Sequence, residues 1–212
     1  TISFGLQKAP GLYDVLVRGV DIVDRFVTPP LDSFDPRNNG RGSLYMVPGN
    51  EETYAIPSIV KEVEVLRNIL EDLDELIDVC IIDTAPAAGL LLTLPWNASD
   101  FVVVPSRMEY LSLDGIAGTI QRAAREGVEL MAIVPTMFRT QTVLHQHHYD
   151  ELKAAAIQNN WPLWEPVADR IEWAEASTMH SMIYSLDGPM SKARHEAIVF
   201  GRRVNKELVR NA

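Results

Sequence analysis

The sequence has few of the features that mark secreted or membrane-embedded proteins. It holds a single cysteine, Cys80, in 212 residues, which excludes an intrachain disulfide framework and a metal cluster held by several thiolates. No apolar run approaches the roughly 20 residues that a membrane-spanning helix needs, so we expect no stable membrane insertion. These absences favour a cytoplasmic protein. The position of Cys80 within an apolar run predicts a small, buried side chain.

Positive charge is also scarce. The chain has 19 Lys and Arg against 29 Asp and Glu, a net charge of −10, which argues against a general nucleic-acid binder. The charge is uneven, because residues 51–78 hold nine acidic and two basic residues, whereas 192–210 hold six basic and two acidic ones. A basic C-terminal segment can contact a polyanion while the whole protein stays acidic. From charge alone, a solvated helix face is an equally good explanation.

The apolar pattern alternates between helical and strand periods along the chain. Helical spacing predicts helices over about 11–26, 58–77, 112–126, 142–158 and 191–210, with Ser112 as an N-cap and Gly127 just past a helix end. Apolar runs predict strands at 78–83, 100–105 and 128–138, a short strand at 43–49 that ends in a turn, a short extended piece at 162–168, and a Pro- and Gly-rich loop at 28–43. We therefore expect one α/β domain over 1–212, a mostly parallel sheet with helices on both faces.

Three residues fall at the carboxyl ends of predicted strands, where such folds build their clefts: Asp83, Pro105 and Thr136. An aspartate at the end of a rigid strand can hold Mg²⁺ beside a nucleotide, and Thr84 adds a neighbouring hydroxyl. Most strand-end aspartates form turns, however, and Asp83 taken alone favours that interpretation.

The motifs around and after Asp83 change this balance. In chain order they are Asp83-Thr84-Ala85-Pro86, Gly89 to Thr93, Ser99-Asp100, Pro105, Glu109-Tyr110-Leu111 with Leu113 and Gly115, "IVPTMF" at 133–138 and "EWAEAS" at 172–177. This order resembles the ParA/Soj branch of the deviant Walker-type ATPases, which also includes MinD. In that family the last motif is a loop before the final helix. The resemblance covers nearly the whole chain, which makes it more specific than any single motif.

The glycine-rich lysine loop of that family, K-G-G-x-G-K-T, does not occur in the 212 residues. In the family, this P-loop and an aspartate-rich second motif come before the segments matched here. The resemblance therefore implies a P-loop NTPase fold of the ParA/MinD kind whose N-terminal strands and P-loop are absent from this sequence. We expect the native protein to be longer.

The resemblance implies a role for each matched position. Asp83 would be the catalytic carboxylate on the magnesium side and would bind Mg²⁺ directly or through water. Thr84 and Pro86 would shape the loop facing the γ-phosphate. Pro105 and Glu109 would lie in a nucleotide-responsive segment at a dimer face. The residues expected near the adenine are Met137, Phe138, Val167, Ala168 and Asp169.

Some of these positions depart from the family pattern or have a simpler explanation. Core packing explains Met137 and Phe138 equally well without the family. After Phe138 the chain continues Arg139-Thr140-Gln141-Thr142, where the family often has Asp-x-Arg-Thr. The segment 167–169 carries an acid where the family often has a base.

The function implied by the resemblance is that of an ATP hydrolase that partitions or positions a plasmid or a chromosome region. Its cofactors would be ATP and Mg²⁺, and its active form a nucleotide-sandwich homodimer that binds DNA non-specifically on the nucleoid, with Arg202 and Arg203 as candidate phosphate contacts. A ParB-like partner would stimulate hydrolysis. Two alternatives remain: a catalytically degenerate regulator or scaffold, and a positional ATPase for a non-DNA cargo. The tail lacks the apolar stripe of a membrane-targeting helix, which ranks that role below DNA binding.

A histidine-rich stretch, "HQHHYDE", invites a metal hypothesis. On a helix His145 and His148 share a face, and Asp150 or Glu151 could add an oxygen ligand. No second ligand cluster is apparent in the sequence, so an exposed polar helix face is the favoured interpretation.

Overall fold

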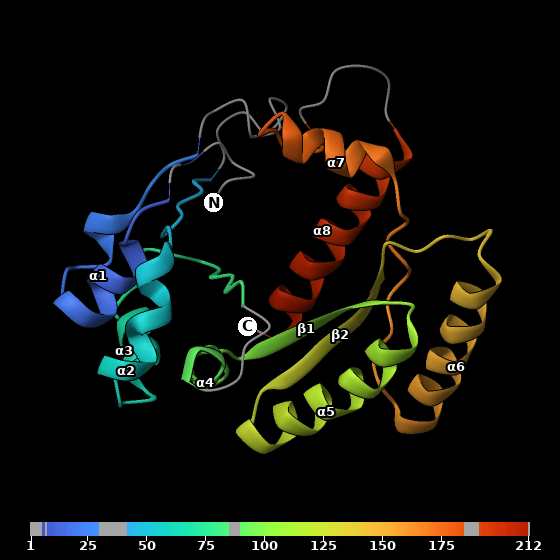
Figure 1. The fold of residues 1–212 in the computed structure, drawn as a ribbon, viewed down its shortest axis with the longest axis horizontal. Helices are drawn as coiled ribbons and strands as arrows, with labels where there is room; N and C mark the ends of the chain where they lie inside the picture. The colour runs from blue at the N-terminus through green and yellow to red at the C-terminus, as the bar shows by residue number, and fades with distance from the viewer. Residues whose placement is uncertain (1–5, 7, 30–41, 85–89, 185–190, 212) are drawn as a thin grey trace. The chain divides into compact units, whose positions relative to one another are not determined.

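The computed structural model describes residues 6, 8–29, 42–84, 90–184 and 191–211. The backbone forms two compact units, Thr1–Ser99 with Ser177–Ser185, and Asp100–Ala176 with Leu186–Ala212. Their elements are labelled in Figure 1. Pro86 and most of the loop expected at 28–43 lie outside the described residues. None of the described helices is long and apolar enough to cross a membrane. The prediction of one domain over 1–212 stays a prediction.

The first unit is built from short helices around an apolar core. Its elements are α1 (Gly11–Arg18), η2 (Val23–Arg25), η5 (Glu51–Ala55), α2 (Ile56–Ile59), α3 (Val65–Glu71) and α4 (Leu90–Ala98). The core cluster consists of Leu16, Ile56, Val60, Leu66 and Leu94. Each helix is too short to be stable alone, so packing around this cluster holds them in place.

The helix expected over 11–26 ends early, at Arg18. Gly19 adopts a left-handed conformation with φ of 68° and donates its N–H to the carbonyl of Asp14, which closes the helix. Asp14 is buried and pairs with two guanidinium groups, Arg18 within α1 and Arg25 in η2, the latter at 2.9 Å. The apolar pattern of the sequence therefore continues across a helix end that Gly19 and the buried ion pairs of Asp14 produce.

The helix expected over 58–77 is also interrupted. Val60 leaves α2 with an extended backbone, and the helix resumes only at Val65. The break places the Val60 side chain in the core, where it is 5% exposed. Burial thus overrides the helical period, while the intervening acidic residues Glu62 and Glu64 remain exposed.

The strand expected at 78–83 does not form, and this prediction was wrong. Residues 78–84 have no strand assignment, Ile81 is 87% exposed, and Cys80 is exposed rather than buried in a core. A strand needs a hydrogen-bonded neighbour. In the described part of this unit the only β pairing is the single antiparallel bridge between Val27 and Met46. That bridge also replaces the strand expected at 43–49.

The second unit contains the parallel strands that the sequence predicted. Strand β1 (Phe101–Arg107) pairs with β2 (Glu129–Thr136), from Phe101 opposite Glu129 to Arg107 opposite Thr136, with an irregularity after Val102. The segment 162–168 continues beside β2 through parallel bridges from Ile133 to Leu163 and from Phe138 to Ala168. The expectation of short extended structure there is confirmed.

Helices cover the two sides of this strand pair (Figure 1). On one side, Ile116 of α5 (Tyr110–Glu126) and Leu152 of α6 (Val143–Asn159) pack on Val104 and Ile133. On the other side, Phe200, Val204 and Leu208 of α8 (Lys192–Asn211) pack on Met131, Ala132 and Val134. Residues of β2 therefore face both cores, Ile133 one and Val134 the other, which explains why this strand is a continuous apolar run.

Two details of the helix ends differ from the sequence predictions. Helix α5 begins after Glu109, which occupies the N-cap position instead of Ser112, whereas Gly127 caps the other end with φ of 77°, as predicted. The stretch 172–177, which the resemblance assigned to a loop, lies within helix α7 (Ile171–Thr178). Its first turn borders a cavity at the end of β2.

Candidate functional site

A cavity of about 330 Å³ opens at the end of β2. The strand end, the segment 167–170 and the first turn of α7 form its walls. The lining residues are Thr136, Met137, Val167, Ala168, Asp169, Arg170, Trp173 and Ala174. Four of the five residues predicted to lie near the adenine are therefore brought together around one cavity. Its volume falls in the usual range of small-molecule sites.

Backbone hydrogen bonds join the two walls. The N–H of Val167 donates to the carbonyl of Pro135 at 2.8 Å, that of Phe138 donates to Val167 at 3.1 Å, and that of Asp169 donates to Phe138 at 3.0 Å. Because the main chains are paired in this way, the side chains of the two walls hold a defined register. The walls of the cavity thus continue the hydrogen-bonded pairing of the sheet.

Met137 has an uncommon backbone conformation at the centre of this arrangement. Its φ is 50°, in the left-handed region that residues with a Cβ rarely adopt, and its side chain is 52% exposed. The paired residues on either side hold it there. Such conformations concentrate at functional sites, and here the result is a large apolar side chain at the open side of the cavity.

Phe138 lies in the core and does not line the cavity. Its side chain is 7% exposed and packs against Tyr149 of α6, with ring centroids 5.3 Å apart. The core-packing alternative for this residue therefore fits the structure. Phe138 supports the site by fixing the chain that carries Met137.

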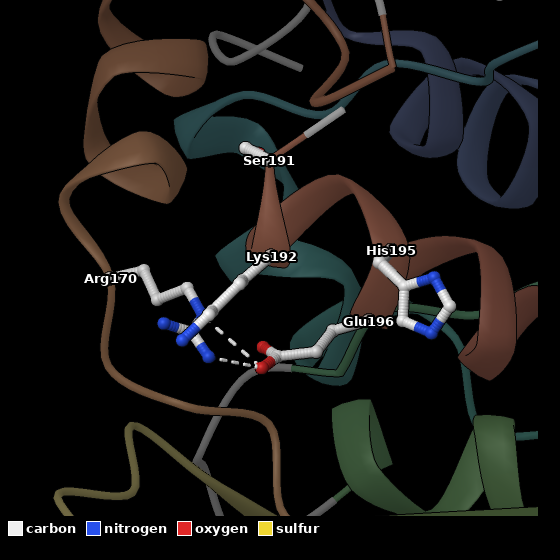
Figure 2. Close-up of a pocket in the computed structure, with 5 residues that line it drawn as sticks. All are labelled: Arg170, Ser191, Lys192, His195 and Glu196. Carbon is white, nitrogen blue, oxygen red and sulfur yellow. Dashed lines mark hydrogen bonds and ion pairs between the residues drawn. The ribbon is translucent and has the colours of Figure 1, made fainter. Parts of the chain in front are cut away.

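Charged residues border the cavity. Arg139 donates from Nε to Oδ2 of Asp169 at 2.6 Å, although Arg139 is largely exposed. Arg170 donates to Oε1 of Glu196 at 3.1 Å from Nε and at 2.5 Å from Nη2, as Figure 2 shows. The hydrogen bond from the Arg170 guanidinium to Glu196 raises the pKa of that guanidinium above its ordinary value. Its charge is therefore permanent.

Glu196 connects α8 to the cavity wall. Besides Arg170, it accepts a hydrogen bond from the N–H of Ala168 at Oε2, at 3.4 Å. Lys192 extends toward the same side of α8, whereas His195 projects away from it (Figure 2). Arg170, Ser191, Lys192, His195 and Glu196 line a second hollow of about 430 Å³. Arg170 thus belongs to both hollows.

The structure places the other predicted residues elsewhere. Asp83 and Thr84 are exposed in the first unit, and Asp83 belongs to no cluster of three potential metal ligands among the described residues. Pro105 lies within β1, opposite Val134, and Glu109 precedes α5 and pairs with Arg107 at 3.4 Å.

The two arginines of α8 differ in their surroundings. Arg202 is exposed, whereas the guanidinium of Arg203 lies over the ring of Trp164 at 4.7 Å from the centroid. Part of the contact capacity of Arg203 is therefore used within the fold.

Sequence reasoning missed three lining residues, Arg170, Trp173 and Ala174. The sequence carried one signal for them: a base follows Asp169 directly, and positions 170, 173 and 174 share a face if a helix begins there. The expectation of a loop at 172–177 concealed this spacing. The indole N–H of Trp173 is buried and makes no hydrogen bond to any described residue.

The chain matches known proteins along most of its length. A family model described as "AAA domain" matches residues 43–129. The sporulation initiation inhibitor protein Soj of Bacillus subtilis is 27% identical over 167 residues, which cover 72% of this chain and 62% of Soj. The chain thus spans about three fifths of the length of this curated relative.

Solved structures of low sequence identity share the fold. The cell division ATPase MinD of Pyrococcus furiosus superposes with a TM-score of 0.73 at 13% identity, covering 97% of this chain and 79% of MinD. A putative plasmid partition protein from Borrelia burgdorferi, bound to AMPPNP, superposes with a TM-score of 0.73 at 16% identity, covering 93% and 74%. At these identities the likeness concerns the α/β fold with parallel strands.

Proposed function

Because the chain belongs to the ParA/Soj–MinD family of deviant Walker-type ATPases, we propose that it is an ATP-dependent partitioning ATPase. Its cargo in this proposal is a plasmid or a chromosome region. The observation that carries the proposal is the convergence of Met137, Val167, Ala168 and Asp169 around one cavity at the end of β2. The family pattern in the sequence indicates the same four positions.

The cavity suits the base of a nucleotide. Met137, Val167 and Ala168 offer apolar surface to the faces of a planar ring. Asp169 and Arg170 place one acidic and one basic side chain at the border of the cavity. Small-ligand sites commonly combine mostly apolar walls with a few polar groups that set orientation. The adenine binds here in the proposal, and the 167–170 segment determines its orientation.

Asp83 is the proposed magnesium-side carboxylate. Among the described residues Asp83 belongs to no cluster of three potential ligands, and Mg²⁺, which keeps several waters, would need few protein ligands here. When bound, Mg²⁺ neutralises charge that develops on the transferred phosphoryl group. Thr84, beside Asp83, adds a hydroxyl on the phosphate side. No glycine in the 212 residues is followed by lysine, so the proposal assigns no phosphate-binding lysine here.

The assembly in this proposal is a nucleotide-dependent homodimer that binds DNA non-specifically and responds to a ParB-like partner. Pro105 and Glu109 lie on β1 and before α5, and are the proposed nucleotide-responsive and dimer-facing residues. Arg202 is the better candidate for a DNA phosphate contact, because Arg203 is held over Trp164. A contact of this kind weakens as salt is raised.

The base site is tested by filling the cavity. Ala168→Phe places a ring in the cavity, and we expect ATP binding, measured with a fluorescent ATP analogue, to weaken by about tenfold or more because the ring occupies the space that the adenine needs. Ala154→Phe, the same substitution on the exposed surface of α6, is the matched control and leaves binding unchanged. Equal binding by both variants would contradict the base site.

Turnover is tested in the complete gene product. Asp83→Ala should abolish magnesium-dependent hydrolysis while nucleotide binding at the base cavity persists, because Asp83 does not line that cavity. Unchanged turnover would refute the role of Asp83. If the wild-type gene product binds ATP and dimerises without hydrolysing it, the scaffold alternative, motivated by the altered positions 139–141 and 168–169, replaces the enzyme.

A further inference from the structure

Helix α6 carries a carboxylate between two imidazoles. Glu151 Oε2 lies 3.0 Å from Nδ1 of His148, and Glu151 Oε1 lies 3.3 Å from Nε2 of His147. The two imidazole rings are neighbours, with centroids 5.6 Å apart. All three side chains come from one turn of one helix in the second unit, so their arrangement depends on the local backbone only.

The spacing of these atoms approaches that of a tetrahedral ligand set. Ligand atoms around Zn²⁺ at bond lengths of about 2.0–2.1 Å lie about 3.3 Å from one another. The two carboxylate oxygens of Glu151 lie 3.0 Å from Nδ1 of His148 and 3.3 Å from Nε2 of His147, and one ligand atom from each residue lies within 4.8 Å of the other two. The His147 side chain is 65% exposed, so its ring can turn and bring its nitrogen closer to the other two ligand atoms.

The burial of the three side chains suits an open site. His148 is 7% exposed at its side chain and is held by the fold, whereas His147 and Glu151 face solvent at 65% and 50%. One ligand is therefore fixed, and the others border water that can complete the coordination.

We propose that His147, His148 and Glu151 bind one divalent transition-metal ion of the zinc class on the surface of α6. Two imidazole nitrogens and one carboxylate oxygen are the donor set of open zinc sites, in which water occupies the remaining position. The coordinating nitrogens, Nε2 of His147 and Nδ1 of His148, carry no proton in the bound form. The ion replaces the present contacts with the carboxylate by three metal bonds.

This ligand set differs from the one that helical spacing alone indicates. Sequence reasoning paired His145 with His148, but Nδ1 of His145 accepts the backbone N–H of Arg139 at 3.2 Å and lies outside the cluster. Adjacent histidines on a helix point in different directions, so their pairing is not expected from the period. Glu151 follows His147 by four residues and His148 by three, so its carboxylate contacts both rings.

The bound ion stabilises the folded chain and takes no part in nucleotide binding. A metal bond between positions 147, 148 and 151 constrains a turn of α6, whose Leu152 and Tyr149 pack in the same core cluster as Phe138. Because the ion binds the folded helix better than the unfolded chain, it raises the midpoint of thermal unfolding by mass action.

The experiment uses the full chain purified without a polyhistidine tag. Zn²⁺ binding is measured by isothermal titration calorimetry, and Co²⁺ absorption reports the coordination geometry. We expect one ion per chain and a higher unfolding midpoint in its presence. His147→Ala and Glu151→Gln, both at exposed positions, should each weaken Zn²⁺ binding by about tenfold or more.

Three matched variants separate this site from the alternatives. His145→Ala and Asp150→Asn remove the ligands of the helix-face pairing, and Cys80→Ser removes the exposed thiol. All three should bind Zn²⁺ as the wild type does. The proposal is overturned if the wild type does not bind Zn²⁺, if His147→Ala binds it unchanged, or if His145→Ala loses as much affinity as His147→Ala.

Discussion

The hydrogen-bonded ion pair between Arg170 and Glu196 leads to a specific prediction about the cavity. Glu196→Gln keeps the size of the side chain and one carbonyl oxygen but removes the negative charge. Arg170 then loses its charged acceptor, and the N–H of Ala168 loses a carboxylate partner. Because Arg170 and Ala168 both line the cavity, a change on α8 is expected to affect ligand binding from outside the lining.

The magnitude follows from the environment of the pair. Hydrogen bonds to charged groups contribute about 1.5–3 kcal/mol when they are well shielded from water. Here the side chains of Arg170 and Glu196 are 26% and 24% exposed, so solvent screening reduces the effect, and glutamine retains a weaker hydrogen bond. We therefore expect a loss of about 1–2 kcal/mol in the free energy of unfolding, a factor of about 5–30 in the folded-to-unfolded ratio.

The assay is urea unfolding followed by tryptophan fluorescence. Trp161, Trp164 and Trp173 lie in the second unit, so the signal reports mainly on the unit that contains the pair. A loss of this size moves the urea midpoint by about 0.5–1 M for the usual slopes. Binding of a fluorescent ATP analogue should weaken by a few fold in the same variant.

A second charge pair on α8 serves as the control. Glu207, which is 26% exposed, lies 3.9 Å from Arg210, whose side chain is 77% exposed, and a long ion pair with one partner in solvent contributes little. Glu207→Gln should leave the midpoint and the nucleotide affinity within error of the wild type. If the two variants behave alike in both assays, Glu196 does not anchor the cavity wall and the reasoning fails.

Three further predictions concern the core, the pH dependence and the DNA contact. Ile133→Ala should cost about 2–5 kcal/mol in urea unfolding, because Ile133 is completely buried, whereas Ile157→Ala, at a position 76% exposed, should cost little. The arginine partners of Asp14 lower its pKa in the folded protein below the ordinary value of 3.8. The contribution of Asp14 to the free energy of unfolding is therefore present above that value and is lost as pH falls through the folded pKa. Asp14→Asn should remove this part of the acid unfolding transition. Arg202→Glu should reduce salt-sensitive retention on DNA without changing the unfolding midpoint, whereas Arg203→Glu should also lower the midpoint through the loss of its contact with Trp164; unchanged retention in both would favour a non-DNA cargo.

Much of the second unit could be predicted from the sequence. The continuous apolar runs at 100–105 and 128–138 predicted the parallel strands, because residues that face two cores must be apolar at successive positions. The stop at Gly127 followed from the freedom of glycine to adopt positive φ, and α6 and α8 followed from length and period.

The sequence was less informative where a partner or a packing contact decides the structure. The run 79–82 has the composition of a buried strand, yet a strand exists only beside another, and none pairs with it among the described residues. The break at Val60 likewise follows from burial, since the helical period of the surrounding apolar residues continues across it.

The sequence by itself determined the motif order on which the resemblance to the family rests, the parallel strands and four residues that line one cavity, because motif order and apolar runs are properties of the chain in one dimension. Only the tertiary structure decided that Arg170 and Trp173 join that wall, that Glu196 anchors it from another helix, and that His147, not His145, shares a carboxylate with His148. These relations depend on side-chain directions and on segments far apart in the chain, which the period of a sequence does not specify.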